Sequence, residues 1–211
     1  MKTAVIIGGG PAGCQCALWL KMLGCDPLIL EQTNHLGGLQ NQSPYKNNWV
    51  VGLINTTGRE LAHHIQNHIK SLDIPVIFSA KINRLDYLEK RFAIWVDGHE
   101  IHTSTIVLAT GLKQRGAQYS SANHYDYDSV TRAFKRSEWE AALPDILANK
   151  KDELLDDDGF VLTDVTCQTP IAGIYAIGEI ANRMPPCVVT SMADGVVAAR
   201  AIEERINISS S

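Results

Sequence analysis

Blocks of apolar residues separated by polar turns predict strands and helices in alternation along the chain. Residues 3–7 (TAVII) are apolar and largely β-branched, which is typical of a strand buried on both faces. Apolar residues then recur at helical spacing over residues 11–23, which predicts a helix. Residues 27–30 predict the next strand, which ends at Glu31. The order strand, helix, strand is that of a βαβ unit.

The first strand and helix are joined by a glycine motif. Gly8, Gly10 and Gly13 form a G-x-G-x-x-G pattern, and Glu31 follows at the end of the second strand. In such a turn the first glycine permits the tight bend, the second lets a pyrophosphate approach the helix N-terminus, and the third permits close packing of helix on strand. A carboxylate at this distance binds ribose hydroxyls. The sequence therefore predicts a dinucleotide site.

Two further buried strands and a meander complete the pattern. Residues 105–111 (TIVLATG) and 173–179 (GIYAIGE) each read as a buried strand that ends in glycine. Between the first unit and residue 105, residues 81–103 alternate as a three-stranded antiparallel meander, with turns at 88–90 and 97–98. A parallel sheet with a meander in its crossover is predicted.

Several motifs in this order resemble the FAD domain of the thioredoxin reductase family. GGGPAG at 8–13, GGLQ at 37–40, TGRELAHHIQNHI at 57–69, ATG at 109–111 and TPIAGIYAIGEI at 169–180 carry the likeness, followed by a helix through residues 188–206. The resemblance implies an α/β fold: a Rossmann-like FAD-binding domain of the type with two dinucleotide-binding domains. It covers residues 1–116 and 154–206 of a single domain spanning 1–211.

The resemblance also implies the residues that would hold FAD. They lie in the glycine turn, after the strands and at the start of the last helix: Gly8, Gly10, Pro11, Ala12, Gly13, Glu31, Gln32, Gly38, Leu39, Gln40, Ile82, Ala109, Thr110, Gly111, Gly178, Glu179, Cys187 and Val188. Glu179 stands where the family has aspartate. Cys187 is similar in position to the family's residue beside the flavin, so van der Waals contact is expected. A helix N-terminus stabilises a thiolate, which leaves a direct redox role as an alternative.

In the family, the segment after ATG is a whole NADPH domain with its own glycine motif and a C-x-x-C pair. Here residues 117–153 stand in its place, have neither motif, and are predicted to be a connector. Ser137 and Glu140 predict a capping box for a short helix that Pro144 ends or restarts. A packed lid bearing Tyr125, Tyr127, Phe134 and Trp139 is the preferred interpretation, and a partner-docking surface is the alternative.

Other patterns suggest metal sites but lack ligands. DDDG at 156–159 has no later bidentate glutamate, and the family has a hairpin turn there. His64 and His68 have ligand-pair spacing, but an exposed helix face that also carries His63 is the preferred interpretation. Cys14 and Cys16 are expected in the core. No metal is predicted.

Composition changes the picture little. The chain has 211 residues, a formal charge of −4 and a pI near 6.0, which favours neither nucleic acid nor an acidic membrane as a partner. Five cysteines without a C-x-x-C pair suit a reducing compartment, and no signal peptide is recognised, so a cytoplasmic location is expected. Apolar surface left by a missing domain makes a homodimer or a partner complex a reasonable expectation.

These features predict an FAD-dependent oxidoreductase whose flavin exchanges electrons with a small-molecule substrate or an electron-donor protein. The alternative is a non-catalytic FAD-binding redox sensor, or an electron-transfer subunit of a complex. A remnant that no longer binds flavin is disfavoured, because the adenosine, pyrophosphate and ribityl elements all persist.

Overall fold

The computed structural model describes residues 3–89, 91–115, 138–181 and 187–210. Its centre is a five-stranded sheet in the order β10-β7-β1-β2-β3, with every neighbouring pair parallel. The strands are β1 (Ala4–Ile7), β2 (Pro27–Leu30), β3 (Val76–Ile77), β7 (Ile106–Leu108) and β10 (Ile174–Ala176). The predicted parallel α/β sheet is confirmed.

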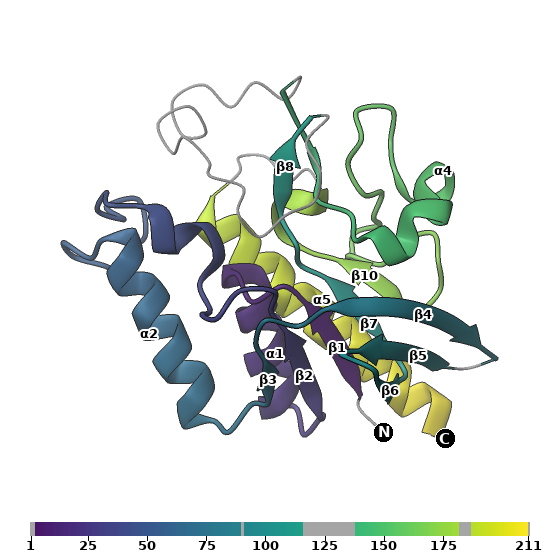
Figure 1. Ribbon diagram of the computed structural model, residues 1–211. Helices are drawn as coiled ribbons and strands as arrows, with labels where there is room; N and C mark the ends of the chain where they lie inside the picture. The colour runs from purple at the N-terminus through teal and green to yellow at the C-terminus, as the bar shows by residue number, and fades with distance from the viewer. Residues whose placement is uncertain (1–2, 90, 116–137, 182–186, 211) are drawn as a thin grey trace.

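Helices cover one face of the sheet. In Figure 1, α1 (Pro11–Met22) and α5 (Val188–Ser210) run side by side behind the strands, and α2 (Gly58–Ser71) lies at the outer side of α1. Alternate residues of β1 explain this layering, because Ala4 and Ile6 pack into the helical core while Val5 and Ile7 pack into the core on the opposite face. A strand with apolar side chains in both directions must be covered on both sides.

The second face is covered by the meander. Strands β4 (Ile82–Leu88), β5 (Arg91–Val96) and β6 (His99–Thr103) pair antiparallel in this order, as predicted. Phe92, Ile94 and Val96 of β5 are buried in the core that the meander shares with the sheet. The molecule therefore has three layers, with helices, parallel sheet and meander in succession (Figure 1).

Helix α2 begins at a complete capping box. The Thr57 hydroxyl accepts from the Glu60 backbone N–H at 3.3 Å, and the Glu60 carboxylate accepts from the Thr57 N–H at 2.7 Å. These bonds satisfy amides that the first helical turn leaves free. The predicted helix over 57–69 is thus confirmed.

The prediction of a helix after Ser137 is wrong for residues 139–141, which the structure describes. Strand β9 (Trp139–Ala141) pairs antiparallel with β8 (Leu112–Gln114), and the Trp139 side chain is 2% exposed. Long-range strand pairing therefore overrides the local capping signal at Glu140. Two short helices follow Pro144, namely the 3-10 helix η3 (Asp145–Lys150) and α4 (Lys151–Leu154).

The described part of the predicted connector, residues 138–153, contributes to the core. Ala141, Leu143 and Leu147 are buried in the same cluster as the meander side chains. Four residues assigned to the lid or its cap lie outside the described part of the chain: Tyr125, Tyr127, Phe134 and Ser137. Among the helices that the structure describes, none combines the length and apolar character needed to cross a membrane.

Candidate dinucleotide site

The carboxyl ends of the parallel strands meet along one edge of the sheet. Gly8 follows β1 and donates its N–H to Leu30 of β2 at 2.9 Å, while Ile177, after β10, donates to Leu108 of β7 at 2.9 Å. The chain runs outward from β1 through β2 to β3 and later returns to β7 on the other side of β1. Ligands of open α/β sheets bind at such a change of direction.

The glycine turn after β1 is closely packed. Gly8 has φ +111°, and a β-carbon there would lie 2.4 Å from the Ala109 carbonyl oxygen. A β-carbon on Gly13 would lie 2.1 Å from the Gly8 oxygen. Gly10 precedes α1 in an extended conformation, and Pro11 occupies the first turn. No side chain caps α1, so the opening amides of this helix are left for other acceptors, as a phosphate site requires.

Glu31 is fixed by two backbone donors. Its Oε2 accepts from the Gly9 N–H at 2.7 Å, and its Oε1 accepts from the Thr33 N–H at 2.7 Å. The residue is 6% exposed. A carboxylate has about four acceptor positions, so two remain for further donors such as hydroxyl groups.

A second glycine loop packs against the first. Gly37 donates its N–H to the Gly9 oxygen at 2.8 Å, and a β-carbon on Gly38 would lie 3.0 Å from the Gly10 Cα. The 3-10 helix η1 (Gly38–Gln42) begins there. Within it Leu39 is half-buried, and Gln40 is buried and accepts from Asn47 Nδ2 at 3.3 Å. The predicted GGLQ motif is thereby adjacent to the glycine turn.

At the other end of the edge, η4 (Gly178–Ala181) meets α1 and α5. A β-carbon on Gly178 would lie 3.1 Å from the Ala12 β-carbon, and the Gly178 N–H donates to Asp194 Oδ2 at 3.0 Å. Glu179 follows and is half-buried. Burial raises the pKa of Glu179, the nearby Asp194 carboxylate raises it further, and its own backbone N–H and the Ser191 hydroxyl oppose the rise.

Cys187 is held immediately before α5. Its carbonyl accepts from the Ser191 N–H at 3.0 Å, and its N–H donates to the Thr190 hydroxyl at 3.2 Å. The sulfur lies 3.4 Å from the same hydroxyl oxygen. The residue is half-buried, and the next residue, Val188, is 9% exposed. The predicted place of Cys187 at the helix N-terminus is confirmed.

The remaining predicted site residues also border this edge. Ala80, two residues before Ile82, donates its N–H to the Glu31 carbonyl at 3.0 Å, which brings the start of β4 beside the glutamate. Gln32 is half-buried next to Glu31, and Gly111 has φ +69° after the ATG strand. The structure therefore gathers along one edge residues that are separated by up to 180 positions in sequence.

One buried hydroxyl at the edge is unsatisfied. Thr110, which follows β7, has no hydrogen-bond partner for its Oγ1 within the described residues. Buried polar groups normally have partners, so this oxygen indicates a polar ligand. Together with the opening amides of α1 and the two free acceptor positions of Glu31, it fits a dinucleotide.

Sequence reasoning missed Thr33, Ser191 and Asp194. Asp194 orients Gly178, Thr33 orients Glu31, and the Ser191 hydroxyl lies against Glu179 and lowers its pKa. The available signal was a polar pair three residues apart, Ser191 and Asp194, followed by Gly195 in the largely apolar first half of the helix.

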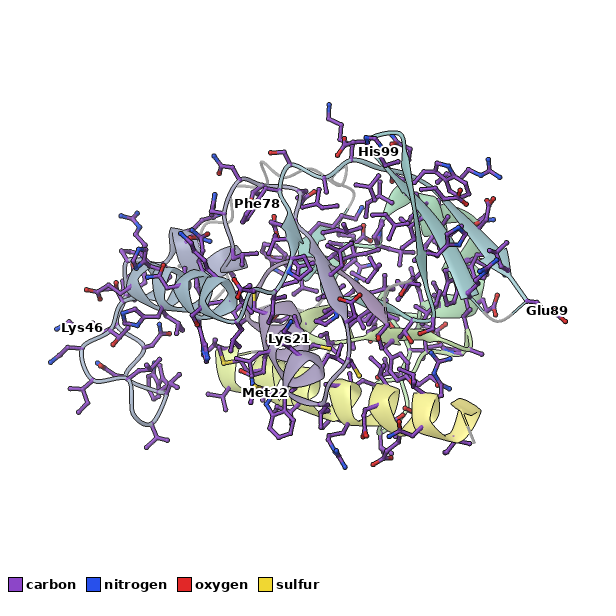
Figure 2. All side chains as sticks on the ribbon, turned by 90° about the horizontal axis from the view of Figure 1, so that it is seen from below. Lys21, Met22, Lys46, Phe78, Glu89 and His99 are labelled. Atoms are coloured by element: carbon purple, nitrogen blue, oxygen red, sulfur yellow. The ribbon has the colours of Figure 1, made fainter. Side chains whose placement is uncertain are left out.

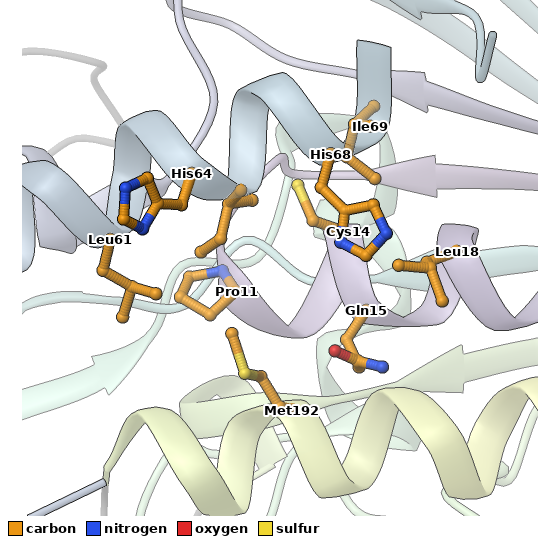
Figure 3. A pocket seen from close by; sticks show the side chains of 10 residues that line it. Pro11, Cys14, Gln15, Leu18, Leu61, His64, His68, Ile69 and Met192 are labelled. Atoms are coloured by element: carbon orange, nitrogen blue, oxygen red, sulfur yellow. The ribbon is translucent and has the colours of Figure 1, made fainter. Parts of the chain in front are cut away.

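A separate cavity of about 180 Å³ lies between α1, α2 and α5. Figure 3 shows His64 and His68 of α2 pointing toward it, with Met192 of α5 below. Pro11 is its one lining residue among those predicted to bind FAD. All three predicted helix-face histidines, including His63, are exposed, and no group of three metal-ligating side chains occurs in the described ranges.

Two other predictions from sequence are confirmed. The DDDG segment is a turn in which Asp156 Oδ1 accepts from the N–H groups of Asp158 at 3.0 Å and Phe160 at 2.9 Å. Cys14 and Cys16 are buried, and burial raises the pKa of both thiols. They are therefore packed, protonated side chains.

The fold defines a Rossmann-like α/β protein. The family described as pyridine nucleotide-disulphide oxidoreductase matches residues 2–133, and the chain belongs to it. Thioredoxin reductase from Buchnera aphidicola subsp. Baizongia pistaciae is 32% identical over 108 residues, which are 51% of this chain and 32% of the relative. Thioredoxin reductase from Mycoplasma genitalium is 29% identical over 112 residues, 53% of this chain and 35% of the relative.

Solved structures agree on the fold. Lactococcus lactis thioredoxin reductase in the FR conformation superposes with a TM-score of 0.76 at 16% identity, and the alignment covers 97% of this chain and 98% of that chain. The chain spans about a third of the length of the curated relatives it matches.

Proposed function

We propose that this chain is an FAD-dependent oxidoreductase that exchanges electrons with a donor or substrate from outside the chain. The observation that carries the proposal is the convergence, at one edge of the sheet, of the glycine turn, the oriented Glu31 and the unsatisfied Thr110 hydroxyl. Family membership supports redox chemistry.

Each part of the edge has a role in this proposal. The first turn of α1 would bind the pyrophosphate, and Glu31 would accept from the adenosine ribose hydroxyls. Glu179 and Ser191 would hold the ribityl chain. Gln40 on η1 and Cys187 at the start of α5 would contact the ring system. When bound, FAD supplies the electron chemistry through its isoalloxazine ring, while the chain positions it and excludes water.

Too few residues lie between strands β8 and β9 for a second dinucleotide-binding domain, which supports the proposal that electrons come from outside the chain. The Arg115 N–H donates to the Glu138 carbonyl at 2.9 Å, so the chain leaves and returns at one point. The 22 residues 116–137 lie between them, and a single βαβ unit needs about 30. The sequence predicted that residues 117–153 stand in place of an NADPH domain. Because residues 138–153 contribute to the core, we now assign only residues 116–137 to that segment.

The working compartment in this proposal is the cytoplasm. All five cysteines are free thiols, which suits a reducing environment: Cys14, Cys16, Cys25, Cys167 and Cys187. The physiological partner is a small-molecule substrate or an electron-donor protein, and assembly as a homodimer is a further proposal that sedimentation would test.

The decisive experiment is an anaerobic titration of the yellow protein with NADPH and with NADH, followed at the visible flavin band. Loss of the band would show that a nicotinamide reaches the flavin directly. Loss with dithionite alone would place the donor among proteins or substrates. A protein that takes up no FAD would overturn the proposal, and one that is reoxidised slowly by oxygen and by no other acceptor would instead be a redox sensor.

A further inference from the structure

An apolar loop projects from the molecule next to the candidate site. Residues 45–56, here called the apolar loop, join η1 to α2, and the Asn47 N–H donates to the Thr56 carbonyl at 2.7 Å across its base. Trp49, Val51 and Ile54 are 94%, 101% and 84% exposed. Figure 2 shows Lys46 on this loop, well outside the helical layer.

The loop has a defined shape rather than being a loose tail. Val50 and Leu53 pack against the helical core, and the Leu53 N–H donates to the Val50 carbonyl at 3.1 Å. With these two side chains turned inward, the apolar side chains beside and between them remain exposed. Exposed clusters of large apolar side chains mark interaction sites.

The charge around the loop is positive. No aspartate or glutamate occurs from residue 32 to residue 59, whereas Lys46 and Arg59 are present and exposed. The first carboxylate that follows along the chain, the exposed Glu60, has a lowered pKa because of its bonds to Thr57, at 2.7 and 2.8 Å, and the nearby Lys46 charge. Lys46 and Arg59 outnumber it, so the loop is a basic and apolar patch on a chain whose formal charge is −4.

The loop is tied directly to the candidate site. Asn47 Nδ2 donates to Gln40 Oε1 at 3.3 Å, and Gln40 lies on η1, whose first residue, Gly38, packs on Gly10. A protein seated on the loop would therefore reach the edge where the flavin ring is proposed to bind.

We propose that the apolar loop is the docking surface for a small acidic electron-transfer protein, which rests on the proposed function. Two molecules of a reduced one-electron carrier would each give up one electron, so that an FAD bound at the edge would take up two electrons and one proton from water, and both carriers would leave oxidised. Electron-transfer complexes bury less surface area than stable dimers do. One loop that carries an exposed tryptophan can supply a contact of that smaller size. A two-fold contact of the loop with itself would bring Lys46 and Arg59 of both copies into one interface, which disfavours that occupant.

The test is calorimetric titration with an acidic [2Fe–2S] ferredoxin at low and high salt, using the FAD-loaded protein. Trp49→Ser and Ile54→Ser are expected to weaken binding about 10-fold or more. Lys46→Glu is expected to weaken binding and reduce its salt dependence. Met22→Ser is the matched control, because Met22 is also an exposed apolar side chain, at 69%, on α1.

Each outcome decides the proposal. Loop variants that lose binding while FAD content stays constant support it. Absence of binding by the unchanged protein at low salt overturns it, as does a loop effect confined to sedimentation of the protein alone or to binding of phosphatidylglycerol vesicles. If the unchanged protein binds ferredoxin but takes up no FAD, the docking surface stands and the proposed function is wrong.

Discussion

Glu31 is the residue on which the adenosine end of the site depends. It is buried, and both carboxylate oxygens accept from backbone donors, so its orientation is set before any ligand arrives. Sequence predicted the residue from its place after the second strand. The two bonds that orient it could not be predicted, because one depends on the path of the glycine turn at Gly9 and the other on the path of the chain at Thr33.

Glu31→Gln should weaken FAD binding about 10- to 100-fold. The substitution removes a charged acceptor and places an amide donor opposite a backbone N–H, and a hydrogen bond to a charged group contributes about 1.5–3 kcal/mol. Quenching of FAD fluorescence measures the affinity. Glu60→Gln is the control, since Glu60 also accepts from a backbone N–H but lies at the start of α2. Equal affinity in the Glu31 variant and the unchanged protein would contradict the assignment.

Glu179 should make the flavin-free protein less stable as pH rises. Its pKa is raised in the fold, so the protonated form is favoured there. The stabilisation is complete below the unfolded pKa and is lost as pH rises through the folded pKa. Urea midpoints measured from pH 4 to 8 should fall more steeply for the unchanged protein than for Glu179→Gln. Parallel curves would show that Glu179 is not the responsible group.

At the scale of elements, the contact of α1 with α5 positions the site. Gly195 of α5 faces α1 so closely that a β-carbon would lie 2.6 Å from the Ala12 oxygen and 2.8 Å from the Cys16 nitrogen. Both atoms are backbone and cannot move aside independently of α1. The sequence showed a glycine inside a helix, but the partner surface that requires it is 180 residues away.

Gly195→Ala should therefore destabilise the protein by about 1–3 kcal/mol, as overpacking does, although alanine favours helix by about 1 kcal/mol. Chemical denaturation gives the free energy of unfolding. Glu204→Ala on the exposed side of the same helix serves as the comparison and should change stability by less than about 0.5 kcal/mol. A stabilised Gly195 variant would mean that the two helices are not in close contact.

Elements with strong local patterns were predictable, and those formed by distant pairing were not. The strand at Pro27–Leu30 was predicted with its observed limits, because it is a compact apolar run between turns. The helix predicted from Ser137 and Glu140 is a strand at Trp139, since pairing with Leu112–Gln114 is invisible to a local reading. Packing of Trp139 in the core stabilises that pairing.

At the scale of the whole molecule, the core should fold without residues 116–137. Arg115 and Glu138 are already paired, so Asn-Gly in place of the segment would make a two-residue hairpin. Shortening the loop lowers its closure entropy, and the melting temperature and FAD content should be unchanged or slightly higher. An insoluble or colourless product would show that the segment is a packed lid on which the fold depends.

The central claim is that this edge of the sheet holds FAD, and the ratio of bound flavin to protein tests it most directly. The protein is purified, incubated with excess FAD, freed of unbound ligand and denatured, and the released flavin is measured by absorbance. The account predicts about one FAD per chain, released as intact dinucleotide. A protein that retains no flavin after this treatment, while circular dichroism shows it to be folded, would contradict the account.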